Sequence, residues 1–431
     1  MGRHAHRRDR AATGALNVVA RAYDWLKGAP LEDHTRRKHK ILKEYFKRYL
    51  AVRCRVLQQT KFRLAVVDGF AGGGRYACGS PGSPLIFVEE LRDAVASINS
   101  HRVANGFPLV EIECLLVLND ADPEVVKLLQ SNCAPLLVQI KADCPQLHIQ
   151  PRFFAEKFEG AYPQIKRLIE DGRYRNVMFN LDQCGHSLVT KETLFDIMRL
   201  AASVEVFYTF AIQSLLAFLH TRDPHKLADQ LRHLEIAPSD LLDKELILNN
   251  GARLGLAEKV VFEAFGSCAR FVSPFSINNP NGWRYWLLHF ANSHRARQVY
   301  TDVLHDNADS QAHFGRSGLN MLSYDPAHEG ALYLFDMSGR EAAKKQLVED
   351  IPRMIEESGD AMVVEEFYEN IYNATPAHKD DIHAAMITCE DLEVLTPTGG
   401  ARRQASTIEV GDTIRMKRQR SFFPIFFNKP K

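Results

Sequence analysis

The sequence predicts an α/β protein built on a doubly wound, mostly parallel β-sheet, and three observations carry this prediction. Apolar runs of strand length alternate with amphipathic helical stretches through residues 34–210, a rhythm typical of βαβ units. One of these runs, Leu64 to Val67, leads through Asp68 into a loop with four glycines. Such a loop at the end of a buried strand is a common small-molecule site in doubly wound sheets.

Length and composition fit a globular protein of more than one domain. The chain has 431 residues, whereas one domain typically has about 100–200. No stretch reaches the ~20 consecutive apolar residues of a membrane span. Eight scattered cysteines without a C-x-x-C pair argue against a zinc or iron–sulfur site and for reduced thiols. We therefore expect a cytoplasmic protein without a metal site or a membrane segment.

The elements of the sheet domain follow from hydrophobic periodicity and from turn signals. A helix begins at His34, because apolar residues from Ile41 to Leu50 recur at helical spacing. Residues 1–33 ahead of it are polar and basic, and we expect them to form a loosely ordered arm. Further strands are predicted over 109–118, 146–150, 176–182 and 204–210, and helices over 84–91, 123–132, 158–171 and 191–201.

The alternation of strands and helices is interrupted after the fifth strand. Helical periodicity from about 215 to 263 predicts a helical insertion, and a late strand follows over 283–291. We therefore assign residues 34–340 to one α/β domain. A charged helix within 341–362 is expected to link this domain to a second one.

The last region, 363–431, has the predicted element order of a winged helix-turn-helix. Helices over 364–372 and 377–389 precede a hairpin formed by 392–395 and 407–417. The hairpin and tail are rich in basic residues, which suit contacts with nucleic-acid phosphates. The predicted nucleic-acid contacts are Arg402, Arg403, Arg415, Lys417, Arg418 and Arg420. Winged helices also dock proteins, so protein docking stays open as the alternative.

The ligand of the glycine loop is open to two interpretations. Gly72 to Ala77 satisfies the dinucleotide pattern G-x-G-x-x-G/A, but there the glycines directly follow the strand and hold a pyrophosphate at a helix N-terminus. Here Asp68 comes first, and a carboxylate would repel a phosphate. The order strand, acid, Gly-x-Ala-Gly-x-Gly instead resembles the first motif of class I S-adenosylmethionine (SAM) methyltransferases, whose cofactor carries an ammonium and a sulfonium.

The SAM interpretation assigns roles to individual residues. The predicted cofactor contacts are Asp68, Gly69, Phe70, Ala71, Gly72 and Gly74 in the loop, and Asp120 at the ribose hydroxyls. Asp122 is the fallback for Asp120, or it only caps the helix that begins at Pro123. Asp182 ends the fourth strand, and we predict that it is a general base whose pKa is raised by burial. Cys184 lacks the basic neighbour of a nucleophilic thiol, so we expect it to be structural.

Five segments carry a resemblance to the three-Cys-motif partner (TcmP) family. They are Lys38 to Tyr45, Val67 to Tyr76, Gly79 to Leu85, Leu181 to Gly185 and Leu288 to Ser293. The family is similar to SAM-dependent methyltransferases, so the resemblance implies a class I methyltransferase-like, Rossmann-like fold. It also implies SAM as the cofactor and a three-Cys-motif protein as a partner.

The leading hypothesis is a SAM-dependent methyltransferase-like protein that acts on, or is guided by, nucleic acid. The segment after Asp182 lacks the prolines and the aromatic residue of amino-methyltransferases, which weakens direct methylation of a base nitrogen. Two alternatives stay open. One is a non-catalytic nucleic-acid-binding or assembly protein that retains the fold, and the other is a nucleotide-dependent Rossmann-like enzyme.

Overall fold

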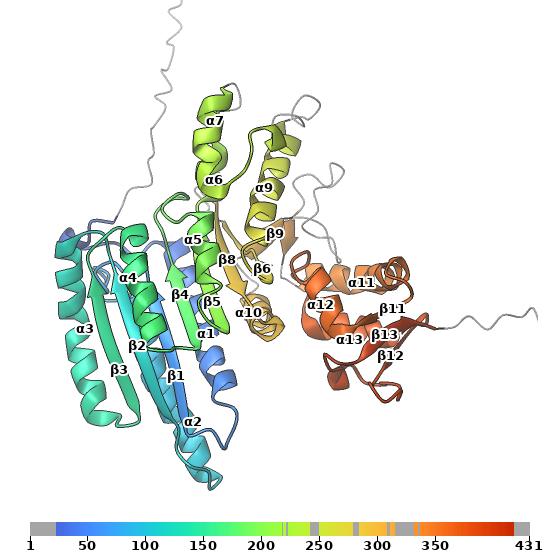
Figure 1. Ribbon diagram of the computed structural model, residues 1–431, viewed down its shortest axis with the longest axis horizontal. Helices are drawn as coiled ribbons and strands as arrows, with labels where there is room; N and C mark the ends of the chain where they lie inside the picture. Colours follow the sequence, from blue (N-terminus) through green and yellow to red (C-terminus); the bar gives the residue numbers. More distant parts are fainter. Residues whose placement is uncertain are drawn as a thin grey trace, which may run out of the picture.

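A computed structural model describes residues 23–217, 219–220, 223–241, 250–278, 284–307, 311–314, 332–334 and 337–417. The predicted α/β fold, with a mostly parallel sheet flanked by helices, is confirmed (Figure 1). The parallel strands lie in the order β3 (Leu147–Phe154), β2 (Glu111–Asn119), β1 (Lys61–Asp68), β4 (Asn176–Leu181) and β5 (Ser203–Phe210). The sheet continues with antiparallel strands, which are β8 (Arg284–Ala291), β7 (Ser276–Asn278), β9 (Gln311–Phe314) and β10 (Leu332–Leu334), while β6 (Phe271–Ser273) also pairs with β8.

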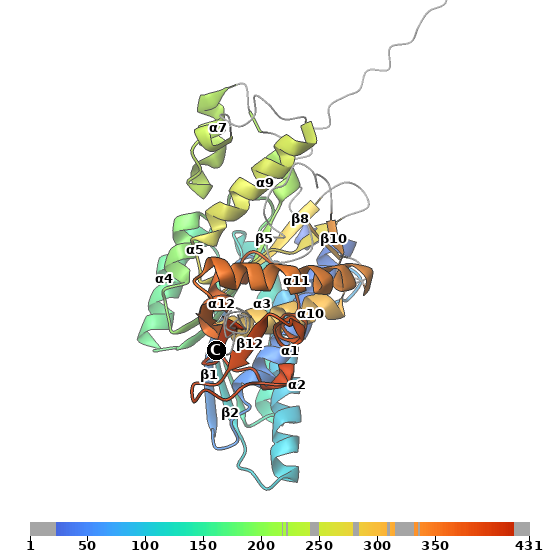
Figure 2. The ribbon, with the colours of Figure 1, turned by 90° about the vertical axis from the view of Figure 1, so that its right-hand side faces the viewer.

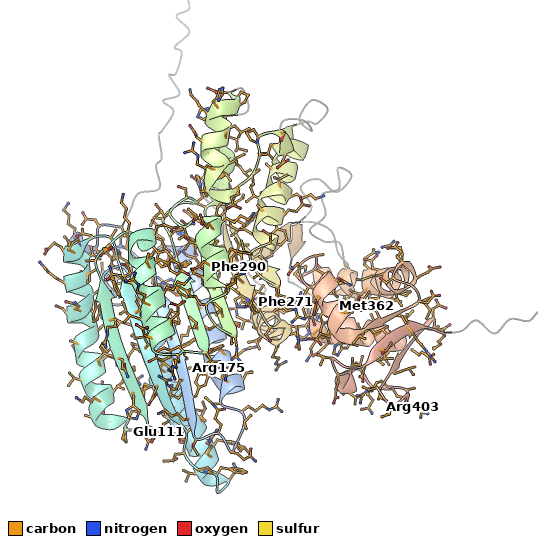
Figure 3. The ribbon with its side chains drawn as sticks, viewed as in Figure 1. Glu111, Arg175, Phe271, Phe290, Met362 and Arg403 are labelled. Carbon is orange, nitrogen blue, oxygen red and sulfur yellow. The ribbon has the colours of Figure 1, made fainter. Side chains whose placement is uncertain are left out.

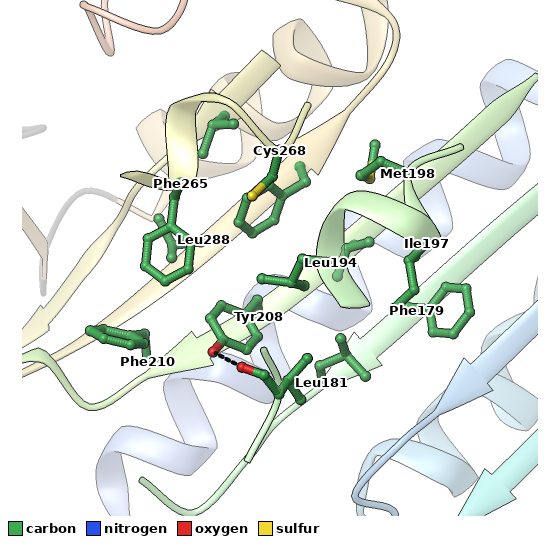
Figure 4. Packing of buried hydrophobic residues seen from close by; sticks show 14 of the residues in the cluster. Phe179, Leu181, Leu194, Ile197, Met198, Tyr208, Phe210, Phe265, Cys268 and Leu288 are labelled. Carbon is green, nitrogen blue, oxygen red and sulfur yellow. Dashed lines mark hydrogen bonds between the residues drawn. The ribbon is translucent and has the colours of Figure 1, made fainter. Parts of the chain in front are cut away.

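Helices cover both faces of the sheet, because successive residues of a strand point to opposite sides. In β1, Leu64 and Val66 share a core with residues of α1, α2, α3 and α10, whereas Ala65 and Val67 share a core with residues of α4 and α5. The helices are α1 (Asp33–Arg53), α2 (Ser83–Ala104), α3 (Pro123–Asp143), α4 (Phe158–Asp171), α5 (Lys191–Ile197) and α10 (His294–Asp306). Figure 4 shows the second of these cores, where Tyr208 packs beside Leu194 and Phe265.

Several elements extend beyond their predicted limits at prolines. The helix predicted to end at residue 132 continues as α3 through Pro135. The strand predicted to end at 150 continues as β3 through Pro151. Because β3 is the outermost strand on its side of the sheet, a proline without an N–H group is tolerated there.

The predicted helical insertion is present above one end of the sheet in Figure 1. Its described elements are α6 (Ile212–Ala217), α7 (Pro224–Leu231), the 3₁₀-helix η2 (Arg232–Leu234) and α9 (Asn250–Gly266). Leu227, Leu231 and Leu234 belong to the same core as α4 and α5. The insertion is therefore packed onto the sheet domain as part of its core.

The C-terminal region forms a module of three helices and a small antiparallel sheet. Its elements are α11 (Met337–Glu357), β11 (Ala361–Val363), α12 (Val364–Ile371), α13 (Lys379–Thr388), β12 (Leu392–Leu395) and β13 (Thr413–Met416). The three strands pair in the order β11-β13-β12. We expected the helix within 341–362 to be a linker, but its Leu347 and Ile351 share a core with Ile382 and Met386 of α13. The helix α11 is therefore part of the module.

The module is joined to the sheet domain by a polar and aromatic interface. The buried Arg297 of α10 donates hydrogen bonds to the carbonyl oxygens of Thr375 and Ala377, and its guanidinium lies 4.1 Å from the ring centroid of Tyr372. Gln298 Nε2 donates to Tyr372 Oη over 2.8 Å. Figure 3 shows Phe271 between the sheet and the module, and Figure 2 shows the module in front of α10.

Two further expectations concern membranes and thiols. None of the helices formed by the described residues is long and apolar enough to cross a membrane. All eight cysteines are free thiols.

Candidate functional site

The predicted site lies beside β1, where the strand order of the sheet reverses: β2 and β3 lie on one side of β1, and β4 and β5 lie on the other. Strand β1 pairs with β2 on one side and with β4 on the other, and all three are parallel. Ligands of doubly wound sheets bind at such a switch point, outside the carboxyl ends of the strands. Asp68 is the last residue of β1 and lies opposite Asn180 of β4, and Asp182 follows the end of β4. The fold therefore brings both predicted acids to one edge.

The glycine loop after β1 is held in a defined shape by backbone hydrogen bonds. Gly69 N donates to Asn180 O over 2.9 Å, and Ala71 N donates to Asn119 O over 2.8 Å. Gly72 and Gly74 have φ angles of +60° and +80°, which favour glycine because a Cβ atom is strained there. The loop thus needs glycine at two of the predicted cofactor-binding positions.

Asp68 is a fully buried carboxyl group. Its Oδ1 accepts a hydrogen bond from Asn180 Nδ2 at 3.2 Å, while Oδ2 accepts none of good geometry among the described residues. Burial raises the pKa of Asp68 from 3.8 to about 7, although the hydroxyl of Ser83 and the amide of Asn180 oppose this rise. A carboxyl group buried in this way is costly to ionise even with these two polar neighbours, and a cationic ligand would relieve that cost.

Asp120, predicted to contact the ribose, accepts backbone hydrogen bonds, one of them from the loop. Its Oδ2 accepts a hydrogen bond from Gly72 N at 3.1 Å, and its Oδ1 accepts one from Asp122 N at 3.0 Å. Burial raises the pKa of Asp120. Asp122 caps α3 by accepting a hydrogen bond from Glu124 N. Of the two roles considered for Asp122, ribose contact and helix capping, the structure shows the capping role. Contact between Asp120 and a ribose stays a prediction.

Asp182 does not have the raised pKa that we expected. Lys38 of α1 forms an ion pair with its Oδ1 atom, and the two side chains are only 10% and 22% exposed. Burial alone would raise the pKa of Asp182, but the Lys38 ammonium, a hydrogen bond from Thr209 and the nearby His39 together lower it. A carboxylate that holds its charge this firmly is a weak general base.

Cys184 is exposed and lies close to the same group of charges. Although its side chain is exposed, the surrounding protein partly desolvates the thiol; this desolvation and the Asp182 carboxylate raise the pKa of Cys184, and the Lys38 ammonium only partly offsets them. Because nucleophilic cysteines have lowered pKa values, this agrees with the expectation that Cys184 is not a covalent nucleophile.

The segment ahead of α1 covers the glycine loop. The 3₁₀-helix η1 (Trp25–Lys27) lies so close to the loop that a Cβ atom on Gly72 would overlap the indole ring of Trp25. Trp25 and Tyr76 have ring centroids 5.0 Å apart, and Ala77 N donates to Ala29 O over 2.9 Å. From Tyr23 onward the predicted arm is thus packed on the loop, while residues 1–22 lie outside the described residues.

Sequence reasoning missed Trp25 and Lys38. A signal for Lys38 was present, because it precedes Ile41, Leu42 and Tyr45 by three, four and seven residues and so lies on the buried face of α1. No comparable signal exists for Trp25. Its contact with Gly72 depends on how the chain ahead of α1 folds back.

The basic residues predicted to contact nucleic acid are largely engaged within the C-terminal module. Arg402 forms a two-pronged ion pair with Asp412, at 2.9 and 3.0 Å, and Arg415 Nε lies 2.7 Å from Glu393 Oε1. Lys417 Nζ donates to the Glu390 carbonyl over 2.7 Å. Arg403 is exposed at the outer side of the module (Figure 3). Arg418 and Arg420 lie outside the described residues.

The part of the module that the structure describes is acidic. Residues 337–417 contain sixteen Asp and Glu side chains against nine Lys and Arg side chains. The helix α12 presents Glu365, Glu366 and Glu369 at its exposed surface. This charge does not match the basic surface that nucleic-acid binding requires.

The dinucleotide pattern does not have the structural setting that its chemistry needs. The helix that follows the loop, α2, begins at Ser83, nine residues after Gly74, and Arg75 instead forms a β-bridge with Pro81. A pyrophosphate held by Gly72 and Gly74 would therefore lack the adjoining helix N-terminus of the fingerprint.

Within the described part of the chain, no three His, Cys, Asp or Glu side chains are grouped so that they could hold a metal ion. No known protein-family model and no curated protein sequence matches the chain.

Proposed function

We propose that the protein is a SAM-dependent methyltransferase-like protein whose cofactor binds at the glycine loop. The observation that carries this proposal is the buried Asp68 at the end of β1, directly before a loop that needs glycine at residues 72 and 74. The strand order β3-β2-β1-β4-β5 supports it, because doubly wound nucleotide-binding sheets have this order. The resemblance to the TcmP family agrees, and it stands on the five sequence segments alone.

The residues around the loop fit a ligand with a positive charge. Asp68 Oδ2 accepts no hydrogen bond of good geometry from the residues that the structure describes, and an ammonium nearby would favour the ionised form of Asp68. Gly69, Phe70, Ala71, Gly72 and Gly74 would surround the methionine part of SAM, and Asp120 would hold the ribose. When bound, SAM supplies an electrophilic methyl group. The indole of Trp25 lies on the same loop surface, so it is either a wall of the pocket or must move when the ligand enters.

Calorimetric titration of the purified protein with SAM, NAD and ATP tests this proposal. We expect SAM alone to bind, and Asp68→Asn to weaken that binding. The matched control is Asp93→Asn, which changes an exposed carboxylate on α2. Substitution of Gly72 is a poor test, because any side chain there also displaces Trp25. Binding of NAD or ATP without SAM would instead support the nucleotide-dependent alternative.

A non-catalytic scaffold is the second candidate function, and the ion pair between Lys38 and Asp182 favours it. The pair removes the predicted general base from proton transfer. The C-terminal module has the order helix, strand, helix, helix, strand, strand, and we propose that it is a winged helix. Its acidic surface favours docking of a protein, such as a three-Cys-motif partner, over nucleic acid. Electrophoretic shifts with short DNA and RNA duplexes at low salt test this preference, and salt-sensitive binding would contradict it.

A further inference from the structure

A hollow lies at the same edge of the sheet, between the loop after β4 and the helical insertion. It has a volume of about 440 Å³, which falls within the range of about 300–1,000 Å³ typical of small-molecule sites. His186 lines it from the β4–α5 loop, and Glu192 lines it from α5. Asp229 of α7, His233 of η2 and Glu235 line it from the insertion. None of the roles assigned above uses this cavity.

The walls of the cavity are held in place by the backbone around them. Leu188 N donates to Gln183 Oε1 over 2.8 Å, and Ala211 N donates to Gly185 O over 3.0 Å. Glu235 has a φ angle of +56°, a left-handed conformation that is unusual for a residue with a side chain. Its N–H donates to the Arg232 carbonyl, which fixes this turn. Backbone strain of this kind gathers at functional sites.

Two imidazoles meet in the cavity. His186 Nδ1 and His233 Nε2 are 3.5 Å apart, and the two ring centroids are 5.2 Å apart. Burial lowers the pKa of both rings, and the second ring lowers that of His233 further, to about 4. Both imidazoles are therefore neutral at pH 7, and they offer hydrogen bonds without a positive charge.

The charged groups around the cavity are mostly acidic. Glu192, Asp229 and Glu235 face it together with one cation, Arg232, which is already paired with Asp229. Lys191 lies outside the lining and pairs with Glu235 at 3.2 Å. These two pairs leave Glu192 as the lining carboxylate with no ion pair among the described residues, and its charge would repel a phosphate or carboxylate and attract an ammonium or guanidinium.

We propose that this cavity binds a basic nitrogen compound, an ammonium or guanidinium group carried by a small molecule or by a side chain. Carboxylates at its rim would attract the cation, and the imidazole pair would accept one N–H group at the single ring nitrogen that its mutual hydrogen bond leaves free to accept. This class of ligand follows from the cavity alone. Its identity as the methyl-accepting substrate rests on the proposed function.

The test uses the intact protein and two probes, 1,4-diaminobutane and Nα-acetyl-lysine amide, which separate a free amine from a lysine side chain. Binding is followed by calorimetry and by the Cε1–H signals of His186 and His233 in NMR spectra. We expect one or both probes to bind and to shift these signals, and inorganic phosphate to do neither. Glu192→Gln should weaken binding about threefold, as expected for a partly exposed charge pair. The matched control, Glu170→Gln on the exposed side of α4, should leave binding unchanged.

Three outcomes would overturn the assignment. These are phosphate binding at the imidazoles, no binding of either amine, and amine binding that Glu192→Gln does not weaken. A separate SAM titration keeps the two proposals distinct. Amine binding without SAM binding would contradict the proposed function and support the cavity assignment. SAM binding without amine binding would support the proposed function and contradict the cavity assignment.

Discussion

Replacing Asp68 by asparagine removes a buried charge and leaves the shape of the side chain unchanged. Burial raises the pKa of Asp68 from 3.8 to about 7 in the folded protein. At about 1.36 kcal/mol per pKa unit, ionising this group costs the folded state about 4 kcal/mol more than the unfolded chain. Asparagine has no such cost, and its Oδ1 still accepts the hydrogen bond from Asn180.

The sign of the pH dependence follows from the direction of the shift. Because the folded-state pKa is the higher one, the folded protein keeps the Asp68 proton while the unfolded chain loses it. The stability that this proton contributes is present below about pH 4 and is lost as the pH rises through about 7. We therefore expect Asp68→Asn to match the wild type near pH 4 and to be more stable by up to about 4 kcal/mol at pH 8.

Chemical denaturation of both proteins between pH 4 and pH 8.5, followed by tryptophan fluorescence, measures this difference. Asp93→Asn, on the exposed surface of α2, serves as the control for the loss of one carboxylate. A stability difference that does not change with pH would refute the reasoning, as would a variant that is less stable than the wild type at pH 8.

Three other substitutions test separate contacts. Gly72 and Gly79 both have positive φ angles, but a methyl group at residue 72 would clash with Trp25, whereas residue 79 has open space around it. Gly72→Ala should therefore lower the free energy of unfolding by at least about 1 kcal/mol more than Gly79→Ala, and equal losses of stability in the two variants would contradict the contact with Trp25. Lys38→Met should raise the pKa of Asp182, measured from its carboxyl carbon by NMR, because burial then acts without the ammonium; an unchanged pKa would contradict the role of the ion pair. Arg297→Met should destabilise the protein by about 2–4 kcal/mol, because the carbonyls of Thr375 and Ala377 lose a buried donor. An unchanged free energy of unfolding in chemical denaturation would count against the role of Arg297 in the interface.

The sequence predicted the parts of the site that depend on local patterns. The strand before Asp68, the glycine loop and the acids that follow β2 and β4 are visible as short runs, and parallel pairing brings their ends together. The pKa of Asp182 was not predictable in this way, because it depends on Lys38, which is 144 residues away. The same holds for Arg402 and Arg415, whose basic character is clear in the sequence but whose acidic partners are set by the folding of the hairpin.

Long-range contacts also explain what was missed in the fold. The helix α11 looks like a charged spacer in isolation, because its buried residues contact α13 only in the folded module. Trp25 follows a basic, polar stretch and shows no periodicity, and its role is visible only from its contacts with Gly72 and Tyr76 in the folded protein. Both depend on tertiary packing, which local propensity does not encode.

Proton release on SAM binding tests the central claim most directly, because it joins the ligand to Asp68. A cation beside this carboxylate lowers its pKa, so binding near pH 7 should release up to about one proton per site and tighten from pH 6 to pH 8. Calorimetric titration in two buffers of different ionisation enthalpy measures the number of protons. We predict release in the wild type and none in Asp68→Asn. No SAM binding, or binding with the same proton count in both proteins, would contradict the account.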